Sequence, residues 1–293
     1  MILLLGASGY VGSAFVRHLN ARRIDFRPVA RRRVDYYNVD HLVQVIRESK
    51  ASFLINCAGY TGKPNVDVCE AHKHECLMGN AVLPGVIREA CDLCRLPWGH
   101  VSSGCIYQGE RPGGGGFKED DVPNFCFRTD NCSFYSGCKA LGEECLAGAD
   151  NVYSWRMRIP FSHIDSDRNY LSKLMRYDRL LDVTNSISNM DEFVEACLQS
   201  WENRIPFGTY NITNTGAITT REVTDVIKRY LMPDKQYLFF KDEAEFMEQV
   251  AGTPRSSCVL DNSKILNSGI QMSDILTALE RSLANWIPRE NQS

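Results

Sequence analysis

Four side chains in the middle of the chain have the types and spacing of a site that acts on a carbonyl group. Tyr135 and Lys139 stand four positions apart, so on a helix they share a face, where the ammonium lowers the free-energy cost of ionising the phenol. Ser103 falls where a buried strand ends, in position to hydrogen-bond the same carbonyl oxygen. These three residues predict reduction of a ketone by hydride. Cys105, two residues beyond Ser103, has no role in such a reduction.

Cys105 therefore has two interpretations. A buried thiol commonly packs as a small apolar residue, and the chain contains twelve cysteines. The placement two residues after Ser103, inside the group that would hold a substrate carbonyl, instead favours a catalytic role. We adopt the catalytic interpretation.

A glycine-rich turn near the start of the chain predicts a dinucleotide site. Gly6, Gly9 and Gly12 lie between an apolar strand and an amphipathic helix. In that setting the glycines allow a tight turn, close backbone approach to a pyrophosphate and close packing of the helix on the strand, with the phosphates at the helix N-terminus. We assign cofactor binding to the residues of this turn: Gly6, Ser8, Gly9, Tyr10, Val11 and Gly12.

The residues after the second strand indicate which dinucleotide is bound. An acid at this place accepts hydrogen bonds from the NAD ribose, whereas Arg31 and Arg32 offer guanidinium groups that suit a 2′-phosphate. The pattern favours NADPH, with NADH as the alternative cofactor and a solvated arginine loop as the alternative structure. A further set of cofactor-binding residues is expected where the next strand ends: Cys57, Ala58, Gly59 and Tyr60. Lys139 is also expected to bind the cofactor, by holding its nicotinamide ribose.

The elements that position these side chains alternate along the chain. Apolar runs with the length of buried strands occur at residues 2–5, 26–30, 53–58, 100–102 and 152–157. Beyond residue 160 the alternation weakens, and helices are expected at 170–177, 219–231 and 273–286. We predict an α/β fold, a Rossmann-type doubly wound parallel sheet with a smaller C-terminal lobe, in which residues 180–183 and 210–212 return to the sheet. The predicted domains are 1–160 with 180–213 for the cofactor, and 161–179 with 214–293 for the substrate.

Composition restricts the partners. A net charge of −3 with only short basic clusters gives no electrostatic footprint for nucleic acid. The opening apolar run breaks at Gly6, too short for a signal peptide or a membrane span, so no membrane partner is expected. Twelve cysteines without an export signal indicate reduced thiols and a cytoplasmic enzyme. A homodimer is left open.

Six segments carry a resemblance to a known family. They read GYTGKPNVDVCE at 59–70, SGCIY at 103–107, GFKEDDVPN at 116–124, RNYLSK at 168–173, GTYNITN at 208–214 and TPRSS at 253–257. With the glycine turn and the Tyr–Lys pair, the chain resembles the extended short-chain dehydrogenase/reductases, and among them the plant-type UDP-4-keto-6-deoxy-glucose 3,5-epimerase/4-reductase of UDP-L-rhamnose synthesis. It is more distantly similar to dTDP-4-dehydrorhamnose reductases, which lack this cysteine, and to GDP-fucose synthases, which carry a similar Ser-x-Cys-Ile-Tyr.

The resemblance implies an NADPH-dependent enzyme that converts a UDP-4-keto-6-deoxy-D-hexose to a UDP-6-deoxy-L-hexose. It makes Cys105 and Lys173 the acid/base pair that moves the protons on C3 and C5, which the neighbouring carbonyl acidifies. Tyr135 and Ser103 would then stabilise the enolate as well as the reduced oxygen. The resemblance also assigns substrate binding to four residues: Lys63, where the plant enzymes usually have Arg, and Asn80, Arg158 and Arg255.

Alternatives stay open at this point. The chain could be a nucleotide-sugar 4-reductase without epimerase activity, could act on a 2-acetamido-4-keto sugar, or could be a non-catalytic NADP-binding regulatory subunit. Lys173 considered alone is typical of a solvated helix charge, and each substrate-binding residue could be structural. Cys69, His72, His74 and Cys76 have a spacing seen in zinc sites but also in helix packing, and we expect no metal.

Overall fold

A six-stranded parallel sheet forms the centre of the protein. The computed structural model describes residues 1–63 and 65–292. Within them the strand order is β10-β5-β4-β3-β1-β2, and every neighbouring pair is parallel. The strands are β1 Ile2–Leu5, β2 Phe26–Val29, β3 Phe53–Asn56, β4 Trp98–Ser103, β5 Val152–Met157 and β10 Gly208–Asn211. Because β1 lies between β2 and β3, the order of connection reverses there, and the carboxyl ends of these strands open a crevice that suits a ligand.

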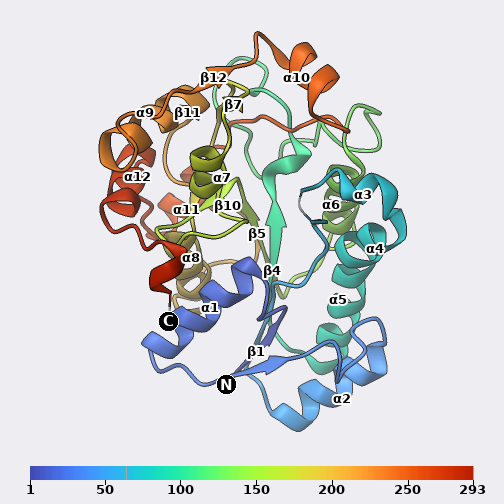
Figure 1. Cartoon of the computed structure of the whole chain (residues 1–293). Helices are drawn as coiled ribbons and strands as arrows, with labels where there is room; N and C mark the ends of the chain where they lie inside the picture. The colour runs from blue at the N-terminus through green and yellow to red at the C-terminus, as the bar shows by residue number, and fades with distance from the viewer. Residues whose placement is uncertain (64, 293) are drawn as a thin grey trace.

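Helices cover both faces of the sheet, as Figure 1 shows. Alternate residues of β1 divide between the faces: Ile2 and Leu4 join one apolar cluster, and Leu3 and Leu5 join the other. The helices beside the sheet are α1 Tyr10–Ala21, α2 Val39–Ser49, α5 Leu83–Cys94, α6 Phe134–Glu144 and α8 Met190–Glu202. Helices α1 and α8 pack on the first face, and α2 and α5 on the second. The predicted doubly wound α/β fold is confirmed, and all five predicted strands are present.

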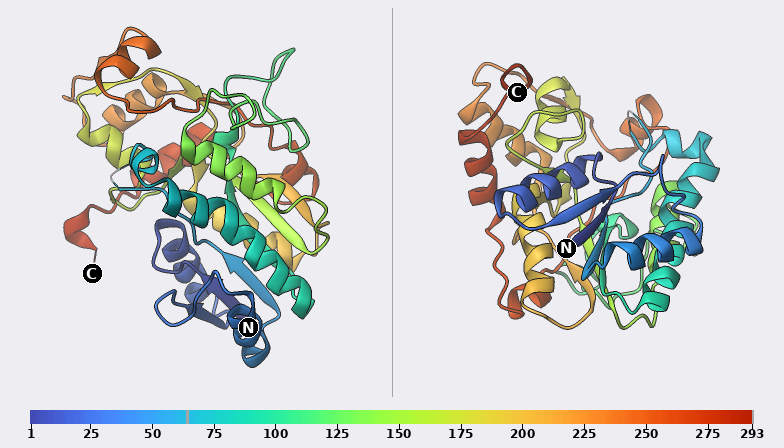
Figure 2. Two further views of the ribbon diagram at one scale, coloured as in Figure 1. Left: turned by 90° about the vertical axis from the view of Figure 1, so that its right-hand side faces the viewer. Right: turned by 90° about the horizontal axis from the view of Figure 1, so that it is seen from below.

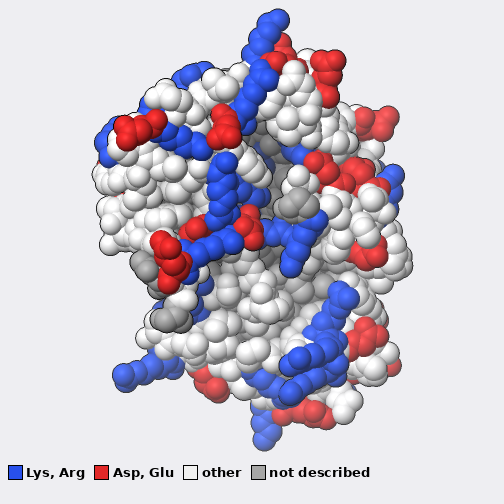
Figure 3. Space-filling view, in the orientation of Figure 1, with Lys and Arg blue, Asp and Glu red and all other residues white. Residues whose placement is uncertain are grey.

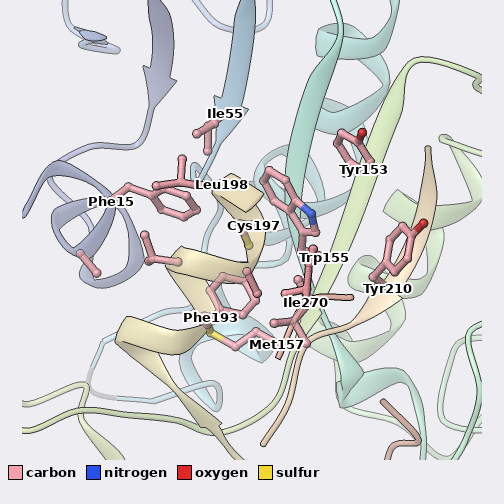
Figure 4. Packing of buried hydrophobic residues seen from close by; sticks show 14 of the residues in the cluster. Phe15, Ile55, Tyr153, Trp155, Met157, Phe193, Cys197, Leu198, Tyr210 and Ile270 are labelled. Atoms are coloured by element: carbon pink, nitrogen blue, oxygen red, sulfur yellow. The ribbon is translucent and has the colours of Figure 1, made fainter. Parts of the chain in front are cut away.

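An aromatic core holds α1 and α8 on the first face. Phe15 of α1 and Phe193 of α8 meet Trp155 of β5 in one buried cluster (Figure 4), with 6.4 Å between the ring centroids of Phe15 and Trp155. Gly99 of β4 makes room for the indole, since a Cβ there would lie 1.9 Å from the ring. Burial of side chains of this size contributes roughly 2 kcal/mol each. This packing fixes α1, and with it the turn before α1, on the sheet.

A third apolar cluster lies between helices beyond the carboxyl ends of the strands, and Figure 2 shows these helices at one end of the molecule. It is built by α7 Tyr170–Arg176, α9 Thr220–Tyr230 and α12 Ile275–Ala284. Helix α9 is fixed at its start by a capping box, in which the side chains of Thr219 and Glu222 each accept a hydrogen bond from the other residue's backbone nitrogen. The three helices predicted after residue 160 are therefore confirmed.

Short elements complete the chain. The strands are β6 Pro160–Phe161, β7 Arg179–Leu180, β8 Thr184–Asn185, β9 Ser188–Asn189, β11 Ile218–Thr219 and β12 Leu238–Phe239. The helices are α3 Val68–Ala71, α4 Lys73–Leu77, α10 Glu243–Gln249 and α11 Ser263–Asn267, with tighter or wider turns at η1 Met78–Val82, η2 Gly104–Ile106 and η3 Arg289–Asn291. Over the described ranges, no helix is both long enough and apolar enough to cross a bilayer.

One predicted strand is wrong. Residues 180–183 do not return to the central sheet, because Leu180 lies in β7, which pairs with β12 instead. The Leu180 side chain belongs to the third cluster. Tyr210, in contrast, lies in β10 and extends the central sheet beside β5, as predicted.

Candidate active site

The turn between β1 and α1 depends on two glycines. Gly6 has a φ of +74°, in the left-handed region, and a Cβ there would lie 2.5 Å from the Ala58 nitrogen. A Cβ on Gly12 would lie 2.1 Å from the Gly6 carbonyl oxygen. The end of β1, the start of α1 and the segment after β3 therefore approach one another at backbone distance, which side chains at these positions would prevent.

A cavity of about 920 Å³ lies at the carboxyl ends of β1, β2 and β3. The predicted cofactor residues that line it are Gly6, Ser8, Gly9, Arg31, Arg32, Cys57, Ala58, Gly59 and Tyr60. Figure 3 shows Lys and Arg side chains gathered around the hollow on this face. Tyr10, Val11 and Gly12 lie outside this lining: Tyr10 and Val11 pack against the aromatic core, and Gly12 is buried. These three residues therefore support the turn through packing on its side away from the cavity.

Two aromatic side chains that line this cavity, Tyr36 and Tyr37, were not predicted from the sequence. The Tyr36 hydroxyl donates a hydrogen bond to the Val29 carbonyl oxygen, which ties the loop after β2 to that strand. Burial is the main cause that raises the pKa of both phenols. A usable signal was the pair of adjacent tyrosines just after Arg32, since ligand pockets are commonly lined by aromatic side chains.

Tyr135 and Lys139 both lie in α6, four residues apart. The helix begins where it does because the Ser133 hydroxyl caps it, accepting a hydrogen bond from the Ser136 nitrogen at 3.2 Å. Lys139 is 6% exposed, and its Nζ donates to the Val101 carbonyl oxygen at 3.2 Å. The amine is thus held against β4, near the strand's carboxyl end.

The electrostatics of this pair differ from the expectation based on spacing. Burial raises the pKa of Tyr135 well above its ordinary value, and Cys105 adds to the shift. Burial also lowers the pKa of Lys139, which Cys105 opposes. The expected reduction in the cost of ionising the phenol is therefore outweighed by desolvation. At neutral pH Tyr135 is a protonated hydrogen-bond donor.

Ser103 and Cys105 come together where β4 ends. The Ser103 Oγ accepts a hydrogen bond from the Cys105 nitrogen at 3.2 Å and so begins the η2 turn. This turn places Cys105, which is 6% exposed, in the cluster against which Tyr135 packs. Burial raises the pKa of the thiol, and hydrogen bonding with Ser103 and Ser136 opposes the shift only in part. The thiol therefore meets Tyr135 in its protonated form.

Lys173 lies outside the central sheet, among the helices of the third cluster. It lies in α7, which begins after Asn169, the residue whose side chain caps the helix. Burial lowers the pKa of Lys173, and the positive charges of Arg168 and Arg255 lower it further. Arg168 also acts on the pKa of Tyr135. A single guanidinium thus lies close enough to influence both Tyr135 and Lys173, which come from different parts of the fold.

Arg168 is a site residue that sequence reasoning did not select. Its guanidinium donates a hydrogen bond to the Gly62 carbonyl oxygen, in the loop after β3. Arg168 therefore joins the segment before α7 to the loop after β3, which begins at the cofactor cavity. The signal was present, because Arg168 opens the same RNYLSK motif that ends in Lys173.

Three of the predicted substrate residues lie in different surroundings. Arg255 forms an ion pair with Asp67 at 2.7 Å, and its Nη1 is buried without a hydrogen-bond partner among the described residues. Arg158 is buried, donates to Asn185 and affects the pKa of the Cys105 thiol. Lys63 is exposed on the loop after β3.

Asn80 hydrogen-bonds to the backbone of Tyr60, and its role in substrate binding stays a prediction. Its amide donates to the Tyr60 carbonyl oxygen at 2.6 Å and accepts from the Tyr60 nitrogen at 3.3 Å. The residue is 1% exposed, so its polar atoms are used within the protein. Asn80 fixes the backbone of Tyr60 at the edge of the cavity.

The zinc-like spacing corresponds to packing. Cys69 and Cys76 are buried together with Cys138, in a cluster against which Tyr135 packs. The side chain of His72 is half exposed. Across residues 1–63 and 65–292, no three His, Cys, Asp or Glu side chains form a group that could hold a metal ion.

Sequence comparison finds relatives of similar and of greater length. The family described as RmlD substrate binding domain matches residues 1–287. A bifunctional dTDP-4-dehydrorhamnose 3,5-epimerase/dTDP-4-dehydrorhamnose reductase from Arabidopsis thaliana is 32% identical over 282 residues, covering 94% of this chain and 90% of the relative. A trifunctional UDP-glucose 4,6-dehydratase/UDP-4-keto-6-deoxy-D-glucose 3,5-epimerase/UDP-4-keto-L-rhamnose-reductase from the same plant is also 32% identical over 282 residues. The chain spans only 41% of the length of that second relative.

Solved structures share the fold. A UDP-rhamnose synthase from Acanthamoeba polyphaga mimivirus superposes with a TM-score of 0.88 at 22% identity, covering 97% of this chain and 98% of that one. A dTDP-4-dehydrorhamnose reductase from Bacillus anthracis in complex with NADP gives a TM-score of 0.80 at 22% identity, covering 96% and 97%. At these identities the likeness concerns the fold.

Proposed function

Because the chain belongs to the family of the RmlD substrate binding domain, we propose that it is a bifunctional 3,5-epimerase/4-reductase that uses NADPH. The substrate is a UDP-4-keto-6-deoxy-D-hexose and the product a UDP-6-deoxy-L-hexose of the rhamnose type. One observation carries the proposal: Cys105 packs with Tyr135 at the end of β4, and the charge of Arg168 acts on the pKa of both Tyr135 and Lys173. Neither the thiol nor the amine has a task in reduction alone. The names of the two plant relatives both include a 3,5-epimerase and a reductase activity.

The cavity beside the glycine turn fits a dinucleotide. A Cβ at Gly6 would fill the space in which the turn meets the segment after β3, so this cradle is specific to glycine. Arg31 and Arg32 line the cavity and suit a 2′-phosphate. The related reductase from Bacillus anthracis is in complex with NADP. NADPH, which supplies the hydride, is the proposed cofactor, with NADH as the weaker alternative.

In the reduction, the chain's own groups act on the carbonyl oxygen. The Ser103 oxygen accepts from a backbone nitrogen, and its O–H would donate to the substrate carbonyl. Tyr135, kept protonated by burial, donates its proton as negative charge develops on that oxygen. The Lys139 ammonium lowers the free energy of the phenolate that remains. A positioned proton donor of this kind contributes about 10²–10⁴-fold in rate.

In the epimerisation, Lys173 acts as the base and Cys105 as the acid. The lowered pKa of Lys173 increases its neutral fraction, which suits it to remove the proton beside the ketone. The raised pKa of Cys105 keeps the thiol protonated, which suits it to return a proton to the opposite face. Lys173 gains the proton that the carbon loses, Cys105 loses the proton that the carbon gains, and exchange with water resets both. Ser103 and Tyr135 hold the enolate oxygen in between.

Positive charge around Lys173 suits the diphosphate of the substrate. Arg255 has a buried, unpartnered Nη1 among the described residues and lies near Lys173, as does Arg168. A guanidinium group can donate two parallel hydrogen bonds to a phosphate, which supports a contact with the substrate diphosphate near Lys173. Arg158, Asn80 and the exposed Lys63 complete the proposed substrate residues.

The setting of the enzyme is also proposed. All twelve cysteines are free thiols, which supports a reducing cytoplasmic environment. The division into residues 1–160 with 180–213 and residues 161–179 with 214–293 stays a prediction, as does a homodimer.

The test is to supply the chain with UDP-4-keto-6-deoxyglucose and NADPH. We expect NADPH to be oxidised and the product to have the L-configuration by NMR. A reduced product that retains the D-configuration would indicate a 4-reductase without epimerase activity. NADP binding without turnover of this sugar or of its 2-acetamido analogue would indicate a regulatory subunit.

A further inference from the structure

Helix α6 carries a third polar side chain on the face that holds Tyr135 and Lys139. Glu143 follows Lys139 by four positions, so the three residues form one stripe along the helix. The Glu143 side chain is only 12% exposed. The Ser102 hydroxyl donates a hydrogen bond to its carboxylate. Glu143 therefore contacts β4 at the residue directly before Ser103.

Arg156 of β5 pairs with Glu143 inside the protein. Its Nε and Nη2 donate to both carboxylate oxygens, with the shortest contact at 2.7 Å. Its Nη1 donates to the Tyr107 hydroxyl at 3.1 Å and to the Glu119 carbonyl oxygen at 3.2 Å, both in the loop after β4. Arg156 also faces Ser102 in the register of β4 and β5. One buried guanidinium thus connects α6, the sheet and that loop.

Glu143 also acts on Lys139 through its charge. Burial lowers the pKa of Lys139, whereas Glu143 raises it. Besides Glu143, the titratable groups around Lys139 are Cys57 after β3, Cys76 of α4, His100 of β4, Cys105 of η2 and Cys138 of α6. Glu143 is the one carboxylate in this set. Removing its charge would also leave the buried Arg156 guanidinium without its carboxylate partner.

From these contacts we propose that Glu143 is a positioning residue of the active site. Through Ser102 and Arg156 it fixes α6 on β4 and β5, so that Tyr135 stays packed against the turn after β4. Its charge also favours the ammonium form of Lys139. The kinetic consequence rests on the proposed reductase activity, whereas the electrostatic consequence can be measured without any substrate.

The kinetic test compares Glu143→Gln with Glu144→Gln. Glu144 is the next residue of the same helix but forms an exposed ion pair with Arg128, with side chains 44% and 75% exposed. We expect Glu143→Gln to lower kcat of NADPH-dependent reduction by about tenfold or more, with a smaller change in KM, because misplacement of a catalytic group reduces the rate strongly. Glu144→Gln should change kcat by less than about twofold. Equal kcat values for the two folded variants would overturn the proposal.

The second test measures the pKa of Lys139 by NMR titration of its Cε in lysine-labelled protein. We expect a lower pKa in Glu143→Gln, no change in Glu144→Gln, and recovery toward the wild-type pKa in Glu143→Asp, which keeps the charge on a shorter arm. A wild-type pKa in Glu143→Gln would contradict the electrostatic part. If the wild type does not turn over the sugar, the proposed function fails while this measurement still tests Glu143.

A milder variant guards against loss of the fold. Ser102→Ala removes one contact to Glu143 and leaves the ion pair with Arg156 in place, so the protein should fold. We expect a fall in kcat of about two- to fivefold with KM unchanged, because a single hydrogen bond contributes modestly. A kcat equal to that of the wild type would contradict the role of this contact in placing α6.

Discussion

The two sides of the crevice are built by different means. On the cofactor side, Gly6 and Gly12 bring backbone against backbone, and the shape of the cavity follows from local sequence. On the proposed sugar side, the side chains come from distant elements: Cys105 from the turn after β4, Tyr135 from α6 and Lys173 from α7. The backbone cradle does not depend on protonation, whereas the side-chain group depends on burial at every position. Cofactor binding and chemistry should therefore be separable by mutation.

The largest expected effect is on the sugar side. Tyr135→Phe should lower kcat by about 10²–10⁴-fold, because the proton donor is removed, and should leave the Kd for NADPH nearly unchanged. Steady-state NADPH oxidation and a fluorescence titration of NADPH measure the two quantities. Tyr177→Phe, at a tyrosine that is 52% exposed, is the matched control. A loss of NADPH affinity as large as the loss of kcat would show that the two sides cannot be separated.

Cys105→Ala should separate epimerisation from reduction on the sugar side. Exchange of solvent protons at C3 and C5 should fall by about 100-fold, because the acid is lost, while reduction of an already epimerised 4-keto-L sugar should continue. NMR measures the exchange, and NADPH oxidation measures the reduction. Cys94→Ala, in α5, is the control. Rhamnose-type product formed at the wild-type rate would make the thiol structural.

Arg31→Ala and Arg32→Ala test the cofactor side. Each should raise KM for NADPH by about tenfold, because a charge-assisted contact to the 2′-phosphate is lost, and should leave kcat unchanged. KM for NADH should not change. Arg33→Ala serves as the control, since Arg33 is not among the residues that line the cavity. An equal rise in KM for both cofactors would exclude a role in reading the 2′-phosphate.

The smallest expected effect is on the pH dependence of proton exchange at C3 and C5. Its limbs should lie away from the ordinary pKa values of lysine and cysteine, with no loss of maximal rate. Burial raises the pKa of Cys105 and lowers the pKa of Lys173, because it favours the uncharged form of each group. The thiol is uncharged when protonated, and the amine is uncharged when deprotonated. Exchange at C3 and C5 should rise with pH as Lys173 loses its proton, at a pH below the ordinary lysine value of about 10.4. It should fall only as Cys105 loses its proton, above the ordinary thiol value of about 8.5. A rising limb at or above the ordinary lysine value would contradict the role of Lys173 as base.

The same contrast explains what could be predicted from the sequence. The glycine turn, Arg31 and the segment after β3 were recognisable because each is a local pattern beside a strand end. The pKa of Tyr135 was not, since spacing shows Lys139 on the same helix face but does not show how far the phenol is desolvated. The contact of Arg168 with Gly62 was also out of reach, because it joins segments that only the tertiary fold brings together. Leu180 was placed in the wrong sheet for the same reason.

The most direct test of the central claim is to form the product in D2O. Purified chain, UDP-4-keto-6-deoxyglucose and unlabelled NADPH should give an L-configured product with deuterium at C3 and C5 and hydrogen from the cofactor at C4, as read by NMR. This pattern follows only if the protons beside the ketone exchange before reduction. A reduced product with no deuterium at C3 and C5 would contradict the account.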